Sequence, residues 1–172
     1  MNSQILLHLS KRLLIHISLV IGTSILFFSV KAQENPPKPI TVTVSTLQHL
    51  SFGTFIQSGT NGTVTVTPEG ARTATGNIIL PNMSSVVTPA LFEVTALPGT
   101  LITIVNGPDS PLSGSNGGTI MLQIGDSNTG SPFIANSEHT EVFIGGILTV
   151  GPLMANPAGA YSGIFQVTFI QQ

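Results

Sequence analysis

The sequence predicts an all-β domain that follows an N-terminal export signal. Short runs of alternating apolar and polar residues recur throughout residues 39–172, and Gly, Pro, Asn and Ser separate them. No window in this stretch carries apolar residues at the i, i+3, i+4 and i+7 spacing of a capped helix. Charged residues make up only 7% of the chain, against roughly 25% in typical soluble domains, so Thr, Ser, Asn, Gln and Gly must supply the polar surface.

The first 32 residues have the pattern of a secretory signal. The basic pair Lys11-Arg12 precedes the apolar run 13–30, and Ala32 completes a cleavage-site pattern of small and branched residues. This order predicts a signal peptide over residues 1–32 and a mature β-sandwich domain over residues 33–172. An uncleaved anchor is the alternative, because the apolar run could just cross about 30 Å of hydrocarbon. In both cases the rest of the chain is exported.

Charge and cysteine content exclude several function classes. After cleavage, Lys38 and Arg72 would be the only cations against seven acidic residues, which gives a net charge of −5. This charge argues against nucleic acid as a partner, because phosphates need a basic surface. The absence of Cys excludes disulfides, thiolate metal sites, a cysteine nucleophile and a lipoprotein anchor. We expect a protein that is secreted or held at the outer cell surface, in contact with a membrane only through its signal segment during export.

The first half of the mature domain reads as short strands and tight turns. Apolar residues at alternate or clustered positions predict inward-facing sides at Ile40–Val44, Leu50–Phe52, Val64–Val66, Asn77–Leu80 and Phe92–Ala96. Residues that favour turns separate these runs at Asn61-Gly62, Pro68-Glu69-Gly70, Pro81-Asn82 and Pro98-Gly99.

The second half continues the pattern with two longer polar segments. Further strands are expected at Ile102–Ile104, Ile120–Ile124, Val142–Ile144, Leu148–Val150 and Tyr161–Phe169. Gly145-Gly146 suggests a bulge or bend, and residues 106–118 and 126–137 are rich enough in Gly, Ser, Asn and Pro to predict surface loops. About eight or nine short strands at regular spacing are typical of a sandwich or barrel, in which two apolar faces pack together.

Three stretches carry a resemblance to a known family. They are Leu50–Phe55, Gly62–Arg72, and Ile147–Val150 followed by Gly159–Phe169. In this order they resemble the secreted bacterial domain of unknown function 4402 family, which is similar to spore coat protein U and archaic fimbrial-subunit domains. The resemblance implies an immunoglobulin-like antiparallel β-sandwich. It also implies that subunits could polymerise by strand donation, in which one subunit's extended segment completes the sheet of the next.

The alternating segment Pro39–Ser45 has two open roles. It lies close to the new N-terminus and could pair within its own domain. It could also fill the open sheet edge of a neighbouring subunit, because an edge presents unpaired N–H and C=O groups.

No group of residues predicts catalysis, and we assign no catalytic, cofactor-binding or metal residue and expect no cofactor. His8 and His16 fall in the signal, so only His49 and His139 remain. His139 lies between Glu138 and Glu141, where a solvated junction between a loop and a strand is favoured over a ligand cluster. The chain also has no Gly-x-Ser-x-Gly elbow, so we predict that it is not an enzyme.

Two other features invite a binding interpretation. Asp126–Gly130 resembles half of a calcium loop, but Ser137 stands where the loop needs Glu, so a polar turn is favoured. Arg72 is the single cation inside the fold, and we expect it to pair with Glu69 or Glu93.

The sequence therefore predicts an exported structural or adhesive protein of the cell surface, with a fimbria-like subunit as one form. Its partners would be other copies of itself or related surface subunits, joined by strand pairing. The alternative is a secreted carbohydrate- or calcium-binding module that uses the segments 106–118 and 126–137. The absence of Trp and the single Tyr161 weigh against a sugar-binding platform.

Overall fold

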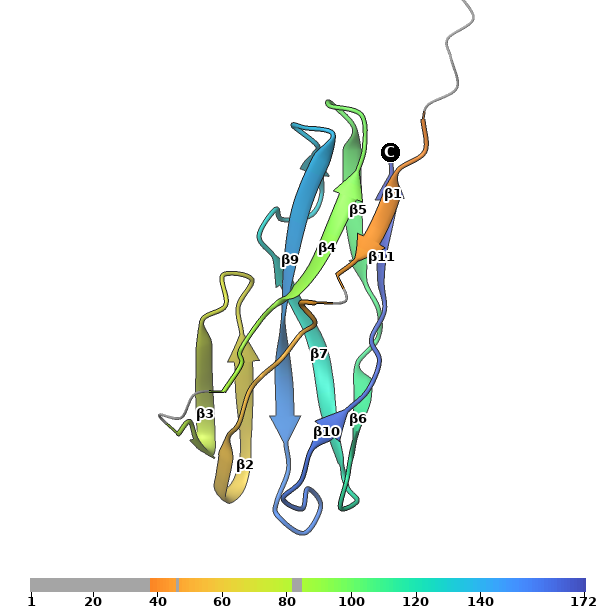
Figure 1. The fold of residues 1–172 in the computed structure, drawn as a ribbon. Helices are drawn as coiled ribbons and strands as arrows, with labels where there is room; N and C mark the ends of the chain where they lie inside the picture. The colour runs from red at the N-terminus through yellow and green to blue at the C-terminus, as the bar shows by residue number, and fades with distance from the viewer. Residues whose placement is uncertain (1–37, 46, 82–84) are drawn as a thin grey trace, which may run out of the picture. The chain divides into compact units, whose positions relative to one another are not determined.

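The computed structural model describes residues 38–45, 47–81 and 85–172, and its compact unit spans Lys38–Gln172. The described residues form strands, turns and irregular segments, which confirms the all-β prediction (Figure 1). The predicted signal peptide over residues 1–32 lies outside the described residues. None of the described residues belongs to a helix that could cross a membrane.

The described residues form eleven strands in two antiparallel sheets. The strands are β1 (Thr41–Val44), β2 (Ile56–Val66), β3 (Arg72–Ile79), β4 (Ala90–Thr95), β5 (Leu101–Asn106), β6 (Ser110–Gly114), β7 (Thr119–Ser127), β8 (Phe133–Ile134), β9 (His139–Val150), β10 (Tyr161–Ser162) and β11 (Val167–Gln171). The larger sheet has eight strands in the order β1-β4-β9-β7-β6-β10, with β2 beside β9 and β3 beside β2. The smaller sheet has three strands in the order β11-β5-β8.

Strict alternation places the core between the sheets. On β4, Phe92 and Val94 are buried while Glu93 is exposed, as the sequence predicts. The rings of Phe92 in the larger sheet and Phe169 in the smaller sheet lie 5.5 Å apart, so the two sheets share one apolar interior. The largest fully buried side chains are Ile102, Ile120, Ile144, Val64, Val66, Val94, Val142 and Val150.

The central strand β9 changes partner along its length. Residues 139–144 pair with β4, and residues 146–150 pair with β2. Gly145 lies between the part of β9 that pairs with β4 and the part that pairs with β2. A Cβ atom at this position would press against the carbonyl oxygen of Val66. The extra residue of the bulge lies on β7, because two residues between Ile124 and Ser127 stand opposite Gly145 alone. The predicted irregularity is therefore confirmed, but its extra residue lies on the neighbouring strand β7.

The tight turn predicted at Asn61-Gly62 is wrong. Both residues continue β2, with a shift of register between Gln57 and Gly62. The turn into β3 lies at Pro68–Gly70, as predicted, where the Gly70 amide donates to the Thr67 carbonyl oxygen at 2.9 Å. Because β2 pairs with both β3 and β9, these two ladders override the local turn preference of Asn-Gly.

The two predicted surface loops are also partly wrong, because each contains a strand. Residues 106–118 include β6, with Leu112 buried, and residues 126–137 include β8, with Phe133 buried. A short strand with one inward apolar residue has no alternation to detect.

The strand predicted over Tyr161–Phe169 is divided. β10 joins the larger sheet beside β6, and β11 joins the smaller sheet beside β5. Residues 163–166 connect the two sheets without belonging to either one.

Candidate functional site

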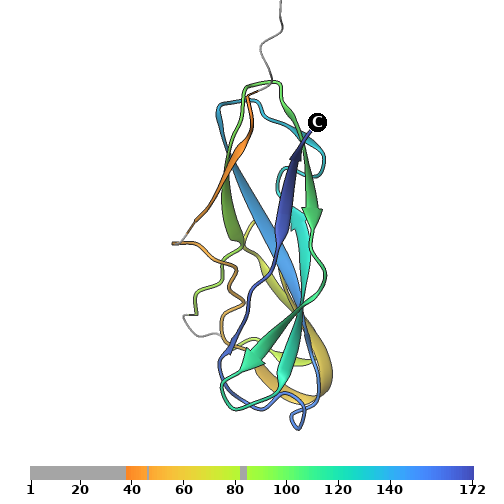
Figure 2. The ribbon, with the colours of Figure 1, turned by 90° about the vertical axis from the view of Figure 1, so that its right-hand side faces the viewer.

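A groove lies on the face of the larger sheet where the apolar side chains of β7 and β9 point toward the interior. Two segments bound it: residues 50–57, which lead into β2, on one side, and residues 161–165, which begin with β10, on the other. Figure 2 shows these two segments running past the sheet without a strand drawn between them. The groove has a volume of about 1060 Å³.

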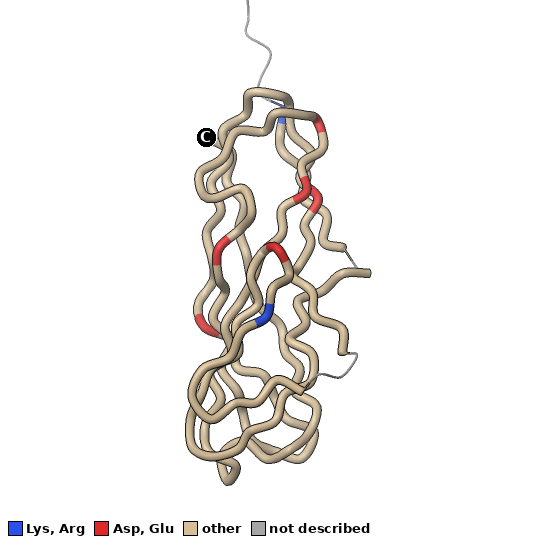
Figure 3. Tube along the Cα trace, turned by 90° about the vertical axis from the view of Figure 1, so that its left-hand side faces the viewer, with Lys and Arg blue, Asp and Glu red and all other residues tan. Residues whose placement is uncertain are grey.

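The floor of the groove is apolar and its lining is uncharged. Ile120, Leu122, Leu148 and Val150 form the floor, and Ile56 and Val86 on the rim are 50% and 72% exposed. Among the described residues that line the groove, none is Asp, Glu, Lys or Arg. Figure 3 shows that the charged residues lie away from the end of the domain opposite the C-terminus. Such a lining favours an uncharged, apolar occupant, because a buried charge would find no partner there.

Within residues 38–45, 47–81 and 85–172, no strand pairs with either wall on its groove side. Gly163, Ile164 and Phe165 form no hydrogen bond with any other residue that the structure describes, and Ile164 is 90% exposed. On the other wall, the carbonyl oxygens of Phe52 and Thr54 accept hydrogen bonds from a side chain and not from a strand. An apolar floor between two such walls can accept one extended segment.

The sequence profile of the family described as "Domain of unknown function (DUF4402)" matches residues 42–170. The chain belongs to this family. The match runs from β1 into β11 and includes every residue that lines the groove. No curated protein matches the chain, and no solved structure matches it.

Arg72 fastens one wall of the groove in this DUF4402 domain. Its Nη1 atom donates to the carbonyl oxygens of Phe52 at 2.9 Å and Thr54 at 3.0 Å. The expectation that Arg72 pairs with Glu69 or Glu93 is wrong. The guanidinium instead donates to the backbone carbonyl oxygens of residues 52 and 54, which a neighbouring strand would otherwise do. Local sequence could not indicate this contact, since β3 and the wall meet only in the fold.

Replacing Arg72 by Met is expected to loosen this wall. The variant loses two hydrogen bonds from a charged donor to backbone, which should lower the free energy of unfolding by about 1–3 kcal/mol. Hydrogen exchange should become faster at the amides of residues 53–57 before it changes in β9. Lys38→Met, which removes a charge elsewhere, is the control. Unchanged exchange in the wall would show that Arg72 does not hold it.

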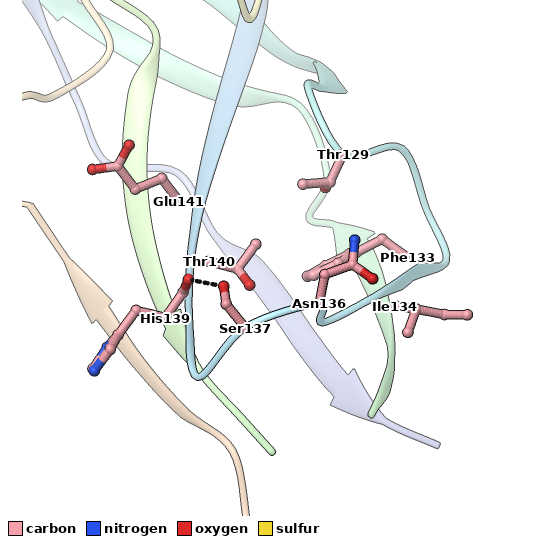
Figure 4. Close-up of a pocket in the computed structure, with 8 residues that line it drawn as sticks. All are labelled: Thr129, Phe133, Ile134, Asn136, Ser137, His139, Thr140 and Glu141. Atoms are coloured by element: carbon pink, nitrogen blue, oxygen red, sulfur yellow. Dashed lines mark hydrogen bonds between the residues drawn. The ribbon is translucent and has the colours of Figure 1, made fainter. Parts of the chain in front are cut away.

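A second depression of about 640 Å³ lies beside the loop that leads into β9 (Figure 4). His139 and Glu141 contribute to its edge, but their side chains point away from Thr129, Phe133 and Asn136. The imidazole Nδ1 of His139 lies 3.2 Å from the Glu93 carboxylate, and both side chains are exposed. In the part of the chain that the structure describes, no three His, Cys, Asp or Glu residues converge as metal ligands would.

Residues 126–130, which resemble half of a calcium loop, form a turn whose hydrogen bonds extend the pairing of β7 with β9. The Asn128 side-chain oxygen accepts a hydrogen bond from the backbone amide of Phe143 at 2.8 Å. The backbone amide of Asn128 donates to the Phe143 carbonyl oxygen at 3.0 Å. The Gly130 amide closes the turn on the Ser127 carbonyl oxygen at 3.2 Å. The Asn128 side-chain oxygen, one of the oxygens a cation would need, is therefore engaged, which favours the polar turn over the calcium loop. The binding-module alternative stays a prediction.

Asn156 is a site residue that sequence reasoning missed. It is buried in the lining of the groove, where its side-chain oxygen accepts a hydrogen bond from the Gly151 amide. Its Nδ2 atom donates to the carbonyl oxygens of Thr119 at 2.6 Å and Ala155 at 3.0 Å. An Asn between Ala and Pro is typical of a surface loop, so only the fold identifies it as an anchor.

Proposed function

We propose that this DUF4402 protein is an exported structural or adhesive subunit of the bacterial cell surface that joins other copies by strand pairing. The observation that carries the proposal is the uncharged groove between residues 50–57 and 161–165, whose two walls lack a strand between them. An extended segment placed there would supply backbone partners to the walls and bury alternate side chains on the floor.

The corner at Tyr161 supports an immunoglobulin-like topology similar to that of spore coat and archaic fimbrial domains. The Tyr161 hydroxyl donates to the carbonyl oxygen of Pro157, four residues upstream, at 2.7 Å. Immunoglobulin-like sandwiches use such a tyrosine corner near the start of a late strand. The passage of residues 161–171 from the larger sheet to the smaller one fits the same topology.

The proposed occupant is the segment Ile40–Val44 of a second copy. In its own domain this segment pairs with β4, which agrees with the first of the two roles left open by the sequence. Pairing with β4 leaves the apolar side chains of this segment poorly buried, because Val44 is 59% exposed and Ile40 and Val42 are only half-buried. Pro39 precedes the segment and lacks an N–H, so the stretch able to form a ladder begins at Ile40. Transfer to a neighbour's groove would bury these side chains more completely.

A disulfide that ties β1 to β4 tests the proposal. Thr43 and Glu93 stand directly opposite one another, and the chain has no Cys of its own. We expect the oxidised variant Thr43→Cys with Glu93→Cys to remain monomeric. The wild type and the reduced variant should form oligomers as their concentration rises. Size exclusion with light scattering, and electron microscopy of the largest species, would measure this difference.

Two matched controls separate strand exchange from general effects. A disulfide between Thr63→Cys and Thr149→Cys joins β2 to β9 and should leave assembly intact. Val86→Asp on the groove rim should block assembly, whereas Val105→Asp on β5 should not, although Val105 is also 45% exposed. A wild-type protein that is monomeric at all concentrations, or a locked variant that still assembles, would refute strand exchange.

A further inference from the structure

An apolar tip projects from the loop between β9 and β10. Leu153 is 52% exposed and Met154 is 97% exposed, and both Pro152 and Ala155 beside them are exposed as well. Figures 1 and 2 place this loop at the end of the domain opposite the C-terminus. Leu153 and Met154 are adjacent, so together they form a small continuous apolar surface, and continuous apolar surfaces are where proteins contact partners or membranes.

The tip is held in shape by hydrogen bonds. The amides of Ala155 and Asn156 both donate to the carbonyl oxygen of Pro152, at 2.8 Å and 2.9 Å. The buried Asn156 side chain ties the same turn to Gly151 and to Thr119 at the start of β7. Leu153 and Met154 are therefore exposed by a turn anchored to the sheet.

The surroundings of the tip carry no charge. Residues 110–125 and 142–172 contain no Asp, Glu, Lys or Arg. In Figure 3 the charged residues lie away from this end of the domain. The end that carries the tip could thus enter an apolar medium without taking a charge out of water.

We propose that this tip, residues 152–155, inserts into the interface of an electrically neutral lipid bilayer. A convex apolar projection needs a partner that can deform around it, and hydrocarbon chains do so without a shaped pocket. Because basic residues are absent from this end, the contact requires no anionic lipid and should not weaken as salt rises. One tip makes a weak contact, which becomes stable when several copies are joined.

The chain contains no Trp, so Met154→Trp provides a single fluorescent reporter at the tip. In the purified protein, vesicles of phosphatidylcholine should shift its emission to shorter wavelength, equally at low and high salt. Adding Leu153→Asp to this variant should weaken partitioning into the vesicles by about tenfold, since it removes a large apolar side chain from the contact. Circular dichroism melts would confirm that both variants are folded.

Leu47→Trp is the matched control, because Leu47 is 96% exposed in another part of the chain. Its emission should not respond to vesicles. The proposal is overturned if Met154→Trp emission does not shift, or if Leu47→Trp shifts as much. It is also overturned if Leu153→Asp leaves partitioning unchanged; a change in self-association alone does not bear on the lipid contact, because Leu153 also lines the groove proposed for a second copy.

Discussion

Replacing Gly145 by Val is expected to lower the free energy of unfolding by about 3 kcal/mol or more, a large part of the roughly 5–15 kcal/mol of an ordinary domain. A Cβ atom there would press on the Val66 carbonyl oxygen and lie 3.1 Å from the Thr67 carbonyl carbon and 3.2 Å from the Pro68 nitrogen. These are backbone atoms, which cannot rotate away. The substitution therefore separates β9 from β2 at the point where β9 changes partner. Urea titration followed by circular dichroism would measure the loss.

Gly146→Ala is the matched control, one residue along the same strand. Its added Cβ would lie 2.9 Å from the Leu50 Cδ2 atom, 3.1 Å from the Leu122 Cδ1 atom and 3.2 Å from the Phe52 Cζ atom. All three are side-chain atoms, which can shift more readily than backbone, so the cost should be clearly smaller. Equal stability of the Gly145→Val variant and the wild type would show that the partner change does not depend on a missing side chain.

Replacing Asn156 by Ala should produce the second large effect, a loss of about 1–3 kcal/mol. The Gly151 amide and the Thr119 carbonyl oxygen would lose a buried side-chain partner in two partly buried hydrogen bonds. Each such hydrogen bond contributes about 0.5–1.5 kcal/mol. Thermal melts would measure the loss, and hydrogen exchange should become faster first in residues 151–160. A variant as stable as the wild type would mean that the loop is held by other contacts.

The pH dependence of an Asn156→Asp variant distinguishes the hydrogen bond that Asn156 accepts from the hydrogen bond that it donates. A carboxylate can still accept from the Gly151 amide but cannot donate to the Thr119 carbonyl oxygen. Burial raises the pKa of this carboxyl in the folded protein above its unfolded value. The folded state then binds the proton more tightly, so the variant should be least stable at neutral pH and recover as pH falls through the raised pKa. No recovery would indicate that the donated hydrogen bond is unimportant.

Sequence reasoning succeeded in the central strands. On β4, β7 and β9, both neighbours are strands, so each inward residue must be apolar and the alternation is complete, as at Ile120, Leu122 and Ile124. It failed at β6 and β8, which each bury only one apolar residue and lie in stretches as rich in Pro, Ser and Gly as loops are. The family assignment rested on motifs spread over the whole domain, and the profile match over residues 42–170 confirmed it.

The order of apolar and polar residues was by itself enough to determine the all-β class, the inward faces of the central strands and the near absence of charge on the surface. Only the tertiary structure decided that Arg72 holds the wall at Phe52 and Thr54, that Asn156 anchors a loop, and that two distant segments enclose an apolar groove. The physical reason is that alternation is a property of neighbours in the chain, whereas a groove and its anchors are made by residues that meet only after the sheets have packed.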